Sequence, residues 1–203
     1  GPGPYGAMVL ADLGADVVKV EPAQDGDKTR YLPGSGSGYF GAYNRNKRSI
    51  SVDLKSEEGL KFAKELVCAS DVLIENFKSG TLDKWGFNAT WFEKYAPTLV
   101  RCSITGYGSA GTQSGLPGYD FILQAESGLM SIAGPVDGEP TKYGVAIVDL
   151  ATGMMAANAI QAALLARFRT GKGQAVEVSL FDTSIALLAN VGNSHLATGK
   201  DSG

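Results

Sequence analysis

Histidine and cysteine are scarce in this chain. His195 is the single histidine among 203 residues, so a Ser-His-Asp triad or a histidine-rich zinc site would have to be built around that one side chain. The two cysteines, Cys68 and Cys102, suggest neither a disulfide framework nor a metal-ligand spacing. Any catalysis must therefore rest on acids and lysines, and the cysteine usage fits a reducing compartment such as the cytoplasm.

The chain also lacks an excess of positive charge and a long hydrophobic run. Its formal net charge is −3 and its pI is near 5.2, which argues against a nucleic-acid surface because phosphate binding draws on clustered Lys and Arg. The longest nearly apolar stretch, residues 154–166, is too short to span a bilayer and carries Asn158 and Gln161. We expect neither a nucleic-acid partner nor a membrane segment.

Both ends of the sequence have the character of interior segments. The chain opens with GPGPYGAMVLADLG, without the basic n-region and apolar h-region of a signal peptide, and it stops at GNSHLATGKDSG. We expect a fragment that begins within a fold. A targeting segment for mitochondria or peroxisomes, as a eukaryotic protein would need, is not present in these residues.

Helical and strand patterns alternate along the chain, which is 44% hydrophobic and 19% charged. Apolar residues at helical spacing predict helices over 5–14, 56–70, 81–87, 90–97, 119–134 and from Asp149 onward. β-Branched runs predict strands at 15–21, 49–54, 71–77 and 99–108, and residues 174–192 predict a last strand followed by a helix. This alternation implies right-handed crossovers and a Rossmann-like α/β fold with a doubly wound parallel sheet.

The opening GPGPYG matches the glycine pattern of a dinucleotide-binding loop, and Glu21 closes the next strand, where such a unit keeps its ribose acid. A dinucleotide-binding oxidoreductase domain is therefore one alternative. Against it, Pro2 and Pro4 remove backbone N–H groups from the loop that would grip a pyrophosphate. A second match, GSGYFG at 36–41, follows a loop rather than a strand and is attributed to chance.

Basic residues stand beside two predicted strands. Arg45, Lys47 and Arg48 precede one, and Lys78 follows the other. Loops beyond the carboxyl ends of parallel strands are where these sheets bind ligands. Each group alone suits a solvated surface, but together with Lys84 they suit a phosphorylated ligand.

Asp149 is a lone acid before a long segment of Ala, Leu, Met and Ile, within KYGVAIVDLATGMMAANAIQAALLARFRTGKGQ (142–174). Asp is a preferred helix N-cap, because its side chain accepts a bond from a free backbone N–H and meets the positive end of the helix dipole. A carboxylate can also act as a covalent nucleophile where no proton shuttle is needed. The two interpretations of Asp149 are compatible, and both stay open on the residues alone.

Six ordered blocks of the chain resemble the class III coenzyme A transferases, the CaiB/BaiF family that includes formyl-CoA transferase and carnitine CoA-transferase. The blocks are LADLGADVVKVEP, NRNKRSISVDLKSEEG, DVLIENFKSG, SITGYG, GYDFILQAESGLM and VDLATGMMAANAIQAALLARFRTGKGQAVEVSLFD. Together they extend over essentially the whole chain. The resemblance implies a Rossmann-like large domain, an interlocked homodimer and an aspartate that becomes acylated. It makes residues 1–203 the amino-terminal part of that large domain, with 181–203 leading toward a small domain.

The resemblance also implies site residues. The catalytic aspartate falls on Asp149, and coenzyme A is a substrate rather than a permanently bound cofactor. The residues on which the coenzyme A contacts fall are Pro2, Val52, Asp53, Leu54, Lys55, Asn76, Phe77, Lys78, Lys84, Gly118, Tyr119 and Asp120. Pro22 stands where some members have an arginine, and the small domain and glycine-rich loop of formyl-CoA transferases are not in this sequence.

One branch of the family, the α-methylacyl-CoA racemases, has GHD where this chain has GYD with Tyr119. A phenol, whose ordinary pKa is near 10, is a poor base for removing an α-proton. We therefore expect transfer of coenzyme A between an acyl-CoA and a carboxylic acid, with SITGYG and VDLATG closest to enzymes that use dicarboxylates such as succinate. The racemase and a non-catalytic coenzyme A-binding module are the remaining alternatives.

Overall fold

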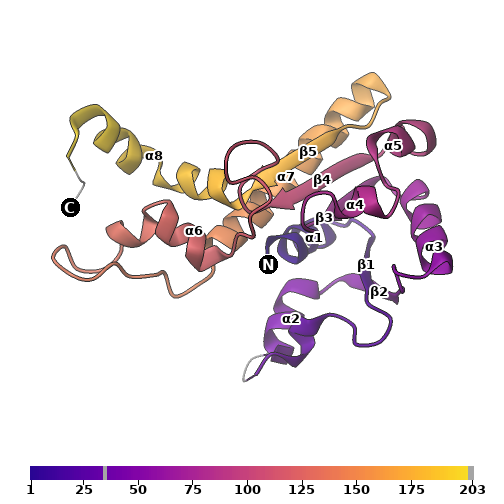
Figure 1. The fold of residues 1–203 in the computed structure, drawn as a ribbon, viewed down its shortest axis with the longest axis horizontal. Helices are drawn as coiled ribbons and strands as arrows, with labels where there is room; N and C mark the ends of the chain where they lie inside the picture. Colours follow the sequence, from indigo (N-terminus) through magenta and orange to yellow (C-terminus); the bar gives the residue numbers. More distant parts are fainter. Residues whose placement is uncertain (34–35, 201–203) are drawn as a thin grey trace.

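The structure is a computed structural model that describes residues 1–33 and 36–200. Its α-helices are α1 Pro2–Asp12, α2 Gly36–Asn44, α3 Glu57–Cys68, α4 Thr81–Lys84, α5 Ala89–Tyr95, α6 Asp120–Glu126, α7 Ile147–Thr170 and α8 Leu180–Thr198. The strands are β1 Val17–Glu21, β2 Lys47–Ser51, β3 Val72–Glu75, β4 Val100–Thr105 and β5 Ala175–Ser179, and two 3-10 helices are η1 Lys28–Tyr31 and η2 Leu129–Ile132. Figure 1 shows this arrangement, with α7 running beside the sheet.

All the strand pairs are parallel, which confirms the predicted α/β class. They form two separate ladders, β1-β2 and β3-β4-β5, rather than the single sheet that the alternation predicted. The strand predicted at 49–54 lies earlier, at Lys47–Ser51, because Lys47 to Ser51 pair with Val17 to Glu21 while residues 52–56 turn into α3. Helix α2 and η1 were not predicted.

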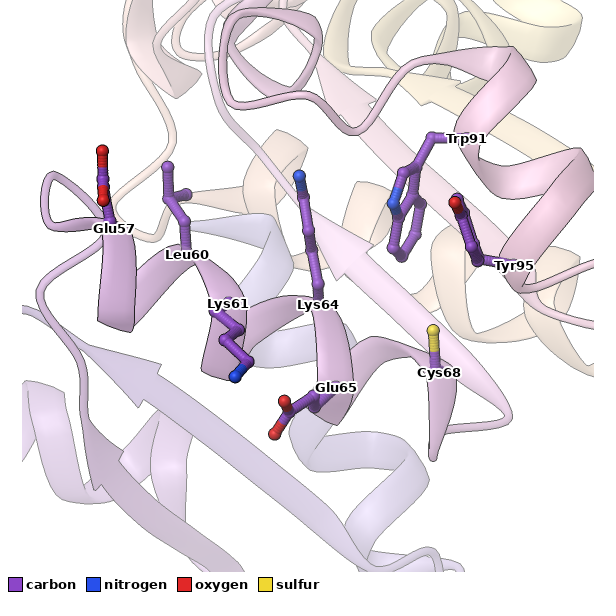
Figure 2. Close-up of a pocket in the computed structure, with 8 residues that line it drawn as sticks. All are labelled: Glu57, Leu60, Lys61, Lys64, Glu65, Cys68, Trp91 and Tyr95. Carbon is purple, nitrogen blue, oxygen red and sulfur yellow. The ribbon is translucent and has the colours of Figure 1, made fainter.

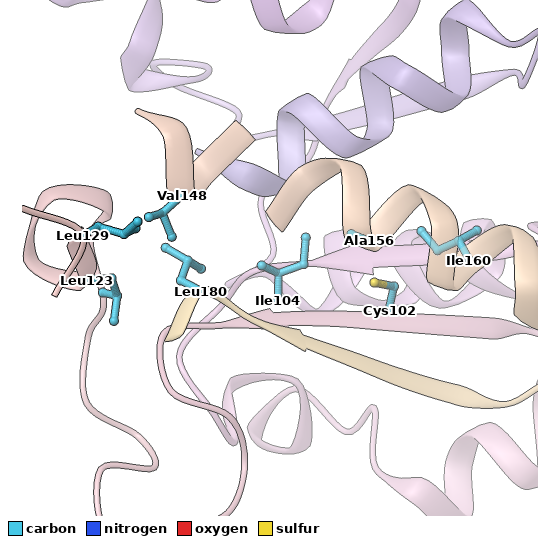
Figure 3. Packing of buried hydrophobic residues seen from close by; sticks show 8 residues of the cluster. All are labelled: Cys102, Ile104, Leu123, Leu129, Val148, Ala156, Ile160 and Leu180. Atoms are coloured by element: carbon cyan, nitrogen blue, oxygen red, sulfur yellow. The ribbon is translucent and has the colours of Figure 1, made fainter. Parts of the chain in front are cut away.

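Helix α7 packs on one face of the three-stranded sheet and forms the main core. Ala156 and Ile160 on α7 face Cys102 and Ile104 of β4 (Figure 3). Near the start of α7, Val148 is fully buried among Leu123, Leu129 and Leu180. The alternating burial along β4 follows from this packing, because successive side chains point to opposite faces of a strand.

The opposite face of that sheet is covered in part by the segment α3 to α5. A second core cluster joins Ala63 and Val67 of α3 with Phe87, Phe92, Ala96 and Leu99. Ser56 begins α3 as an N-cap, accepting a hydrogen bond from the Gly59 N–H at 3.0 Å. These predicted helices are confirmed, each within a few residues of its expected bounds.

Helices α1 and α7 cross in direct contact at two glycines. A Cβ on Gly6 would lie 2.7 Å from the Gly153 carbonyl oxygen, and one on Gly153 would lie 2.8 Å from the Pro2 carbonyl oxygen. Only glycine permits so close an approach of two helix backbones. The crossing therefore fixes the amino-terminal end of α1 beside the first turns of α7.

Among the described residues, one helix is long and apolar enough to cross a membrane. This is α7, whose most apolar 18-residue window has a mean hydropathy of 1.3 and is 44% buried. Its contacts with α1, β4 and β5 give a reason for that composition, since a helix buried in a protein core is apolar for the same physical reason as a membrane span.

Candidate active site

Asp149 lies in the first turn of α7, where its side chain is 17% exposed. The helix begins at Ile147 with Ala146 in the cap position and no side-chain cap bond. The prediction that Asp149 is the N-cap is therefore wrong: the helix starts two residues earlier. The carboxylate is thus presented from within the turn, and its own backbone N–H needs another acceptor.

Asp120 supplies that acceptor from α6. The Asp149 N–H donates to Asp120 Oδ2 at 2.8 Å, and Gln124 Nε2 donates to Asp120 Oδ1 at 2.5 Å. Gln124 in turn accepts the Tyr143 N–H through Oε1 at 2.9 Å. These bonds form a continuous chain from the loop before α7, through α6, to the backbone of Asp149.

Two influences act on the ionisation of Asp149 in the same direction. Burial raises the pKa of Asp149 above its ordinary value, and the charge of Asp120 raises it further. A carboxylate with a raised pKa is a stronger nucleophile once it is ionised.

Tyrosines from α1 and α2 lie on the side of Asp149 that faces α1. Tyr5 and Tyr39 both meet the Tyr43 ring edge-on, with centroid distances of 5.6 and 4.6 Å. The Gly1 nitrogen donates to the Tyr39 hydroxyl at 2.7 Å and lies 3.7 Å from Asp149 Oδ2. Burial, with the nearby Tyr43 and Asp149, raises the pKa of Tyr39 to about 12, so its hydroxyl stays protonated at neutral pH.

The start of α1 also links Asp149 to the end of β3. Asn76 follows β3, and a Cβ on Gly3 would lie 3.4 Å from Asn76 Cγ. The neighbouring Pro2 is buried against α7 at Gly153. The structure therefore places Pro2, Asn76 and Asp149, three of the predicted site residues, around the start of α1.

Most of the other predicted coenzyme A contacts lie near the carboxyl ends of parallel strands, and Lys84 lies at the end of α4. Residues 52–55 connect β2 to α3, with Val52 buried and Asp53 and Lys55 exposed. Gly118 packs against the backbone of Gly106 just after β4, at 2.6 Å between Gly106 Cα and a Cβ on Gly118. This contact sets the position of exposed Tyr119 and buried Asp120.

Phe77 and Lys78 line a hollow of about 340 Å³ between the sheet and α4. The Phe77 ring is half-exposed and meets Trp85 edge-on at 5.2 Å. Neither Lys78 nor Lys84 has an ion-pair partner within residues 1–33 and 36–200, and both are exposed. Asp149 does not line this hollow.

The basic group near residues 45–48 does not have the predicted phosphate-binding form. Arg45 pairs with Asp12 at 2.5 Å and Arg48 pairs with Asp16 at 2.6 Å. Lys47 Nζ donates to the carbonyls of Pro4 and Tyr43 and to the Asn44 side chain. Burial lowers the pKa of Lys47 to about 8. These three residues hold α1, α2 and the β1-β2 ladder together. Of the basic residues that the sequence assigned to a phosphorylated ligand, Lys78 and Lys84 therefore remain available in the described part of the chain.

The structure contradicts the dinucleotide-binding alternative. Five of the six residues of GPGPYG lie inside α1, so the segment is a helix rather than a phosphate-binding loop. Glu21 is 3% exposed, accepts from Arg30, Ser49 and the Asp27 N–H, and therefore cannot reach a ribose. The second motif at 36–41 lies within α2.

A larger groove of about 550 Å³ lies elsewhere, between α3 and α5 (Figure 2). Lys64 rises beside the Trp91 ring, and Tyr95 and Cys68 close one end of the groove. None of the predicted site residues lines it. The size of this groove therefore does not make it the candidate active site. The candidate active site is assigned from Asp149 and the residues around it.

Gln124, Tyr39, Tyr43 and Gly153 are parts of the candidate site that the sequence analysis missed. For Gln124 a signal was present, because it follows Asp120 by four residues and so shares its helix face. Tyr39 and Tyr43 come near Asp149 only through the tertiary packing of α2. Nothing local in the sequence marks that proximity.

The geometry defines a parallel α/β protein that holds a partly buried acid at the start of a core helix. The sequence profile of CoA-transferase family III matches residues 1–203. This chain belongs to that family.

Individual relatives agree with the family assignment. The chain is 45% identical over 203 residues to the succinyl-CoA:glutarate CoA-transferase of Mus musculus, covering 98% of this chain and 47% of that protein. It is 43% identical over 208 residues to the succinate--glutarate CoA-transferase of Agrobacterium fabrum, covering 98% and 52%. A crystal structure of a CAIB/BAIF family protein from Brucella suis superposes with a TM-score of 0.93 at 45% identity, covering 99% and 55%. The chain spans about half the length of the curated relatives it matches.

Proposed function

We propose that this chain is part of an enzyme that moves coenzyme A between an acyl-CoA and a free dicarboxylic acid, with Asp149 as the nucleophile. The observation that carries the proposal is the placement of Asp149. It is the acid at the start of α7, partly buried and held through its backbone by Asp120, in a chain of the CoA-transferase family. The names of the mouse and Agrobacterium relatives support succinate and glutarate as the class of acid.

The chemistry requires only a carboxylate and a thiolate. The Asp149 carboxylate attacks the thioester carbonyl, the C–S bond breaks, and a mixed anhydride and coenzyme A thiolate result. The thiolate then attacks the aspartyl carbonyl, which forms an aspartyl-CoA thioester and releases the first acid. The acceptor acid repeats both steps in reverse and restores the Asp149 carboxylate, so no general base is needed.

The proposal assigns coenzyme A to the strand ends around the start of α1. In it, Pro2, Asn76, Phe77 and residues 52–55 contact the coenzyme, Lys78 and Lys84 hold its phosphates, and Gly118 and Tyr119 contact it near Asp149. Support comes from the exposure of both lysines and from the placement of Pro2, Asn76 and Asp149 around the start of α1. The side chain of Asp120 turns inward, so it acts on Asp149 rather than on coenzyme A.

Three further assignments belong to the same proposal. Residues 1–203 form the amino-terminal part of a large domain, with 181–203 leading toward a small domain. Two chains form an interlocked homodimer. The enzyme works in the cytoplasm, or in mitochondria or peroxisomes if the source is eukaryotic. The half-length match to the relatives supports the first assignment.

The test uses the full-length protein with succinyl-CoA and glutarate. Wild type should form glutaryl-CoA, and Asp149→Asn should form none, because an amide cannot accept an acyl group and leave as a carboxylate. Lys78→Ala should raise the KM for succinyl-CoA about tenfold, the effect of one charge-assisted contact. Lys172→Ala, an exposed lysine at the other end of α7, is the matched control and should change nothing. Exchange of the α-proton of a 2-methylacyl-CoA in deuterated water at the turnover rate would favour a racemase instead.

A further inference from the structure

Gln124 and Asp120 form a buried polar pair beside Asp149. Gln124 is 1% exposed and Asp120 is 9% exposed. Both oxygens of Asp120 and both ends of the Gln124 amide have hydrogen-bond partners, at distances between 2.5 and 2.9 Å. Burying an aspartate in a protein interior is unfavourable unless hydrogen bonds of this kind compensate its charge. Asp120 therefore depends on Gln124 and on the Asp149 N–H for its place in the interior.

The direction of each bond in this chain is fixed. The Tyr143 N–H can only donate, so Gln124 must present its oxygen there and its NH₂ group to Asp120. Asp120 then accepts from Gln124 with one oxygen and from the Asp149 N–H with the other. The orientation of Asp120, and with it the position of the Asp149 backbone, thus depends on Gln124.

We propose that Gln124 is a positioning residue for acyl transfer, which holds the Asp120 carboxylate against the first turn of α7 and so fixes the place and the electrostatic surroundings of the nucleophile Asp149. This inference rests on the proposed function. It assigns two separable effects to the pair: the hydrogen bonds hold the Asp149 backbone, and the negative charge of Asp120 makes Asp149 more basic.

The groups that face Asp149 allow the charge effect to be isolated. They are Asp120 from α6 and the hydroxyl-bearing Tyr39 and Tyr43 from α2. Asp120 is the carboxylate of this set, and the raised pKa values of both tyrosines keep their hydroxyls neutral at pH 7. Removing its charge therefore lowers the pKa of Asp149 and moves the acidic limb of acylation to lower pH.

The sequence offers a variant that preserves every bond and moves only the charge. In Asp120→Asn with Gln124→Glu, the new amide oxygen accepts from the Asp149 N–H and the new amide NH₂ donates to the glutamate. The glutamate still accepts from the Tyr143 N–H. The charge then lies farther from Asp149, where its Coulomb effect is weaker. Gln124→Met keeps the length of the side chain and removes both bonds.

The experiment measures acylation of Asp149 in the full-length protein by rapid mixing with succinyl-CoA across a pH series, together with the Tm of each variant. Gln124→Met should lower the acylation rate about 100-fold at pH 7, since a displaced nucleophile loses that much. The double variant should recover the Tm and most of the rate, with its acidic limb at lower pH than in wild type. Gln161→Met, an exposed glutamine on α7, is the control and should match wild type in rate and pH profile.

Three results would overturn the inference. Gln124→Met could acylate at the wild-type rate, the double variant could recover stability without rate, or its pH profile could coincide with that of wild type. Each of these presupposes that wild type acylates Asp149. Failure of wild type to acylate that residue at all would instead refute the proposed function, so the two failures are distinguishable.

Discussion

Glu21 shows how a single buried acid can organise the turn beside a candidate site. It receives hydrogen bonds from Arg30, Ser49 and the Asp27 N–H, and the Arg30 guanidinium lies 3.7 Å from the Phe40 ring centroid. These contacts join β1, β2, η1 and α2. The residue that resembled a ribose ligand in the sequence is therefore a structural anchor for the segment that carries Tyr39 and Tyr43.

The anchor predicts a pH dependence of stability. The bonds from Arg30, in spite of burial, lower the pKa of Glu21 from 4.5 to about 2. An acid whose pKa is lower in the folded state than in the unfolded state stabilises the fold at pH values above the unfolded-state pKa. For Glu21 this contribution is lost as the pH falls from about 4.5 to about 2. Glu21→Gln should therefore cost about 2 kcal/mol at pH 7, allowing for the partial exposure of Arg30, and much less at pH 2.5. Urea unfolding at both pH values measures this, and an equal loss at both would contradict it.

At this scale the sequence indicated Asp149 as a candidate through its isolation in an apolar segment, but it did not predict the residues around it. The N-cap prediction failed because Ala146 takes the cap position and Asp120, distant in sequence, satisfies the Asp149 N–H. Arg45 and Arg48 were assigned to phosphate because their partners, Asp12 and Asp16, lie far away along the chain. A local sequence pattern shows which charged residues are present. Which residue each of them pairs with depends on tertiary contacts and cannot be predicted from the local pattern.

Among the elements, the crossing of α1 and α7 matters most for the site, because it places the start of α1 beside Asp149. Gly153→Ala would put a Cβ 2.8 Å from the Pro2 carbonyl oxygen and 2.9 Å from Tyr5 Cδ1. Since backbone cannot move aside without separating the helices, we expect a loss of about 2 kcal/mol or more and a large fall in transfer activity.

Gly192→Ala is the matched control for that substitution. Gly192 is also inside a helix, α8, but a Cβ there would lie 3.4 Å from Leu188 Cβ, close to ordinary contact. Replacing glycine by alanine in a helix interior stabilises by about 0.5 to 1 kcal/mol, so this variant should gain stability and keep activity. Thermal unfolding compares the two, and a Gly153→Ala protein as stable as wild type would show that the crossing is looser than described.

Most elements could be predicted from periodicity, since α1, α3, α7 and the strands β1, β3, β4 and β5 follow clear apolar patterns. Helix α2 could not, because its residues GSGYFGAYN contain three glycines and carry little helical signal. Its helical form is stabilised by tertiary contacts, including those of Tyr39 and Tyr43 with α1 and of Phe40 with Arg30. The shift of β2 has a similar origin, because its register is set by pairing with β1.

In the molecule as a whole, large apolar side chains stay exposed on the helices that extend beyond the sheet. Phe168 on α7 is 85% exposed and Leu196 on α8 is 83% exposed, and α8 leads away from the sheet toward the carboxyl end (Figure 1). Exposed apolar surface of this kind favours association. The interlocked homodimer of the proposal would bury such residues.

Residues 1–203 expressed alone should therefore associate. Size-exclusion chromatography with light scattering should give a mass above the 21.2 kDa of one chain, and Phe168→Ser with Leu196→Ser should reduce that association. A monomer that unfolds in one cooperative transition would speak against the interlocked dimer.

The proposed function depends on covalent acylation of Asp149, and mass spectrometry of the full-length protein detects that acylation. After mixing with succinyl-CoA in the absence of an acceptor acid, the peptide that contains Asp149 should carry an acyl or coenzyme A adduct. Hydroxylamine should remove the adduct, because an anhydride or a thioester at that carboxylate is an acylating agent. Asp149→Asn should carry none. An adduct mapped to another residue, or turnover by the Asn variant, would show that Asp149 is not the nucleophile.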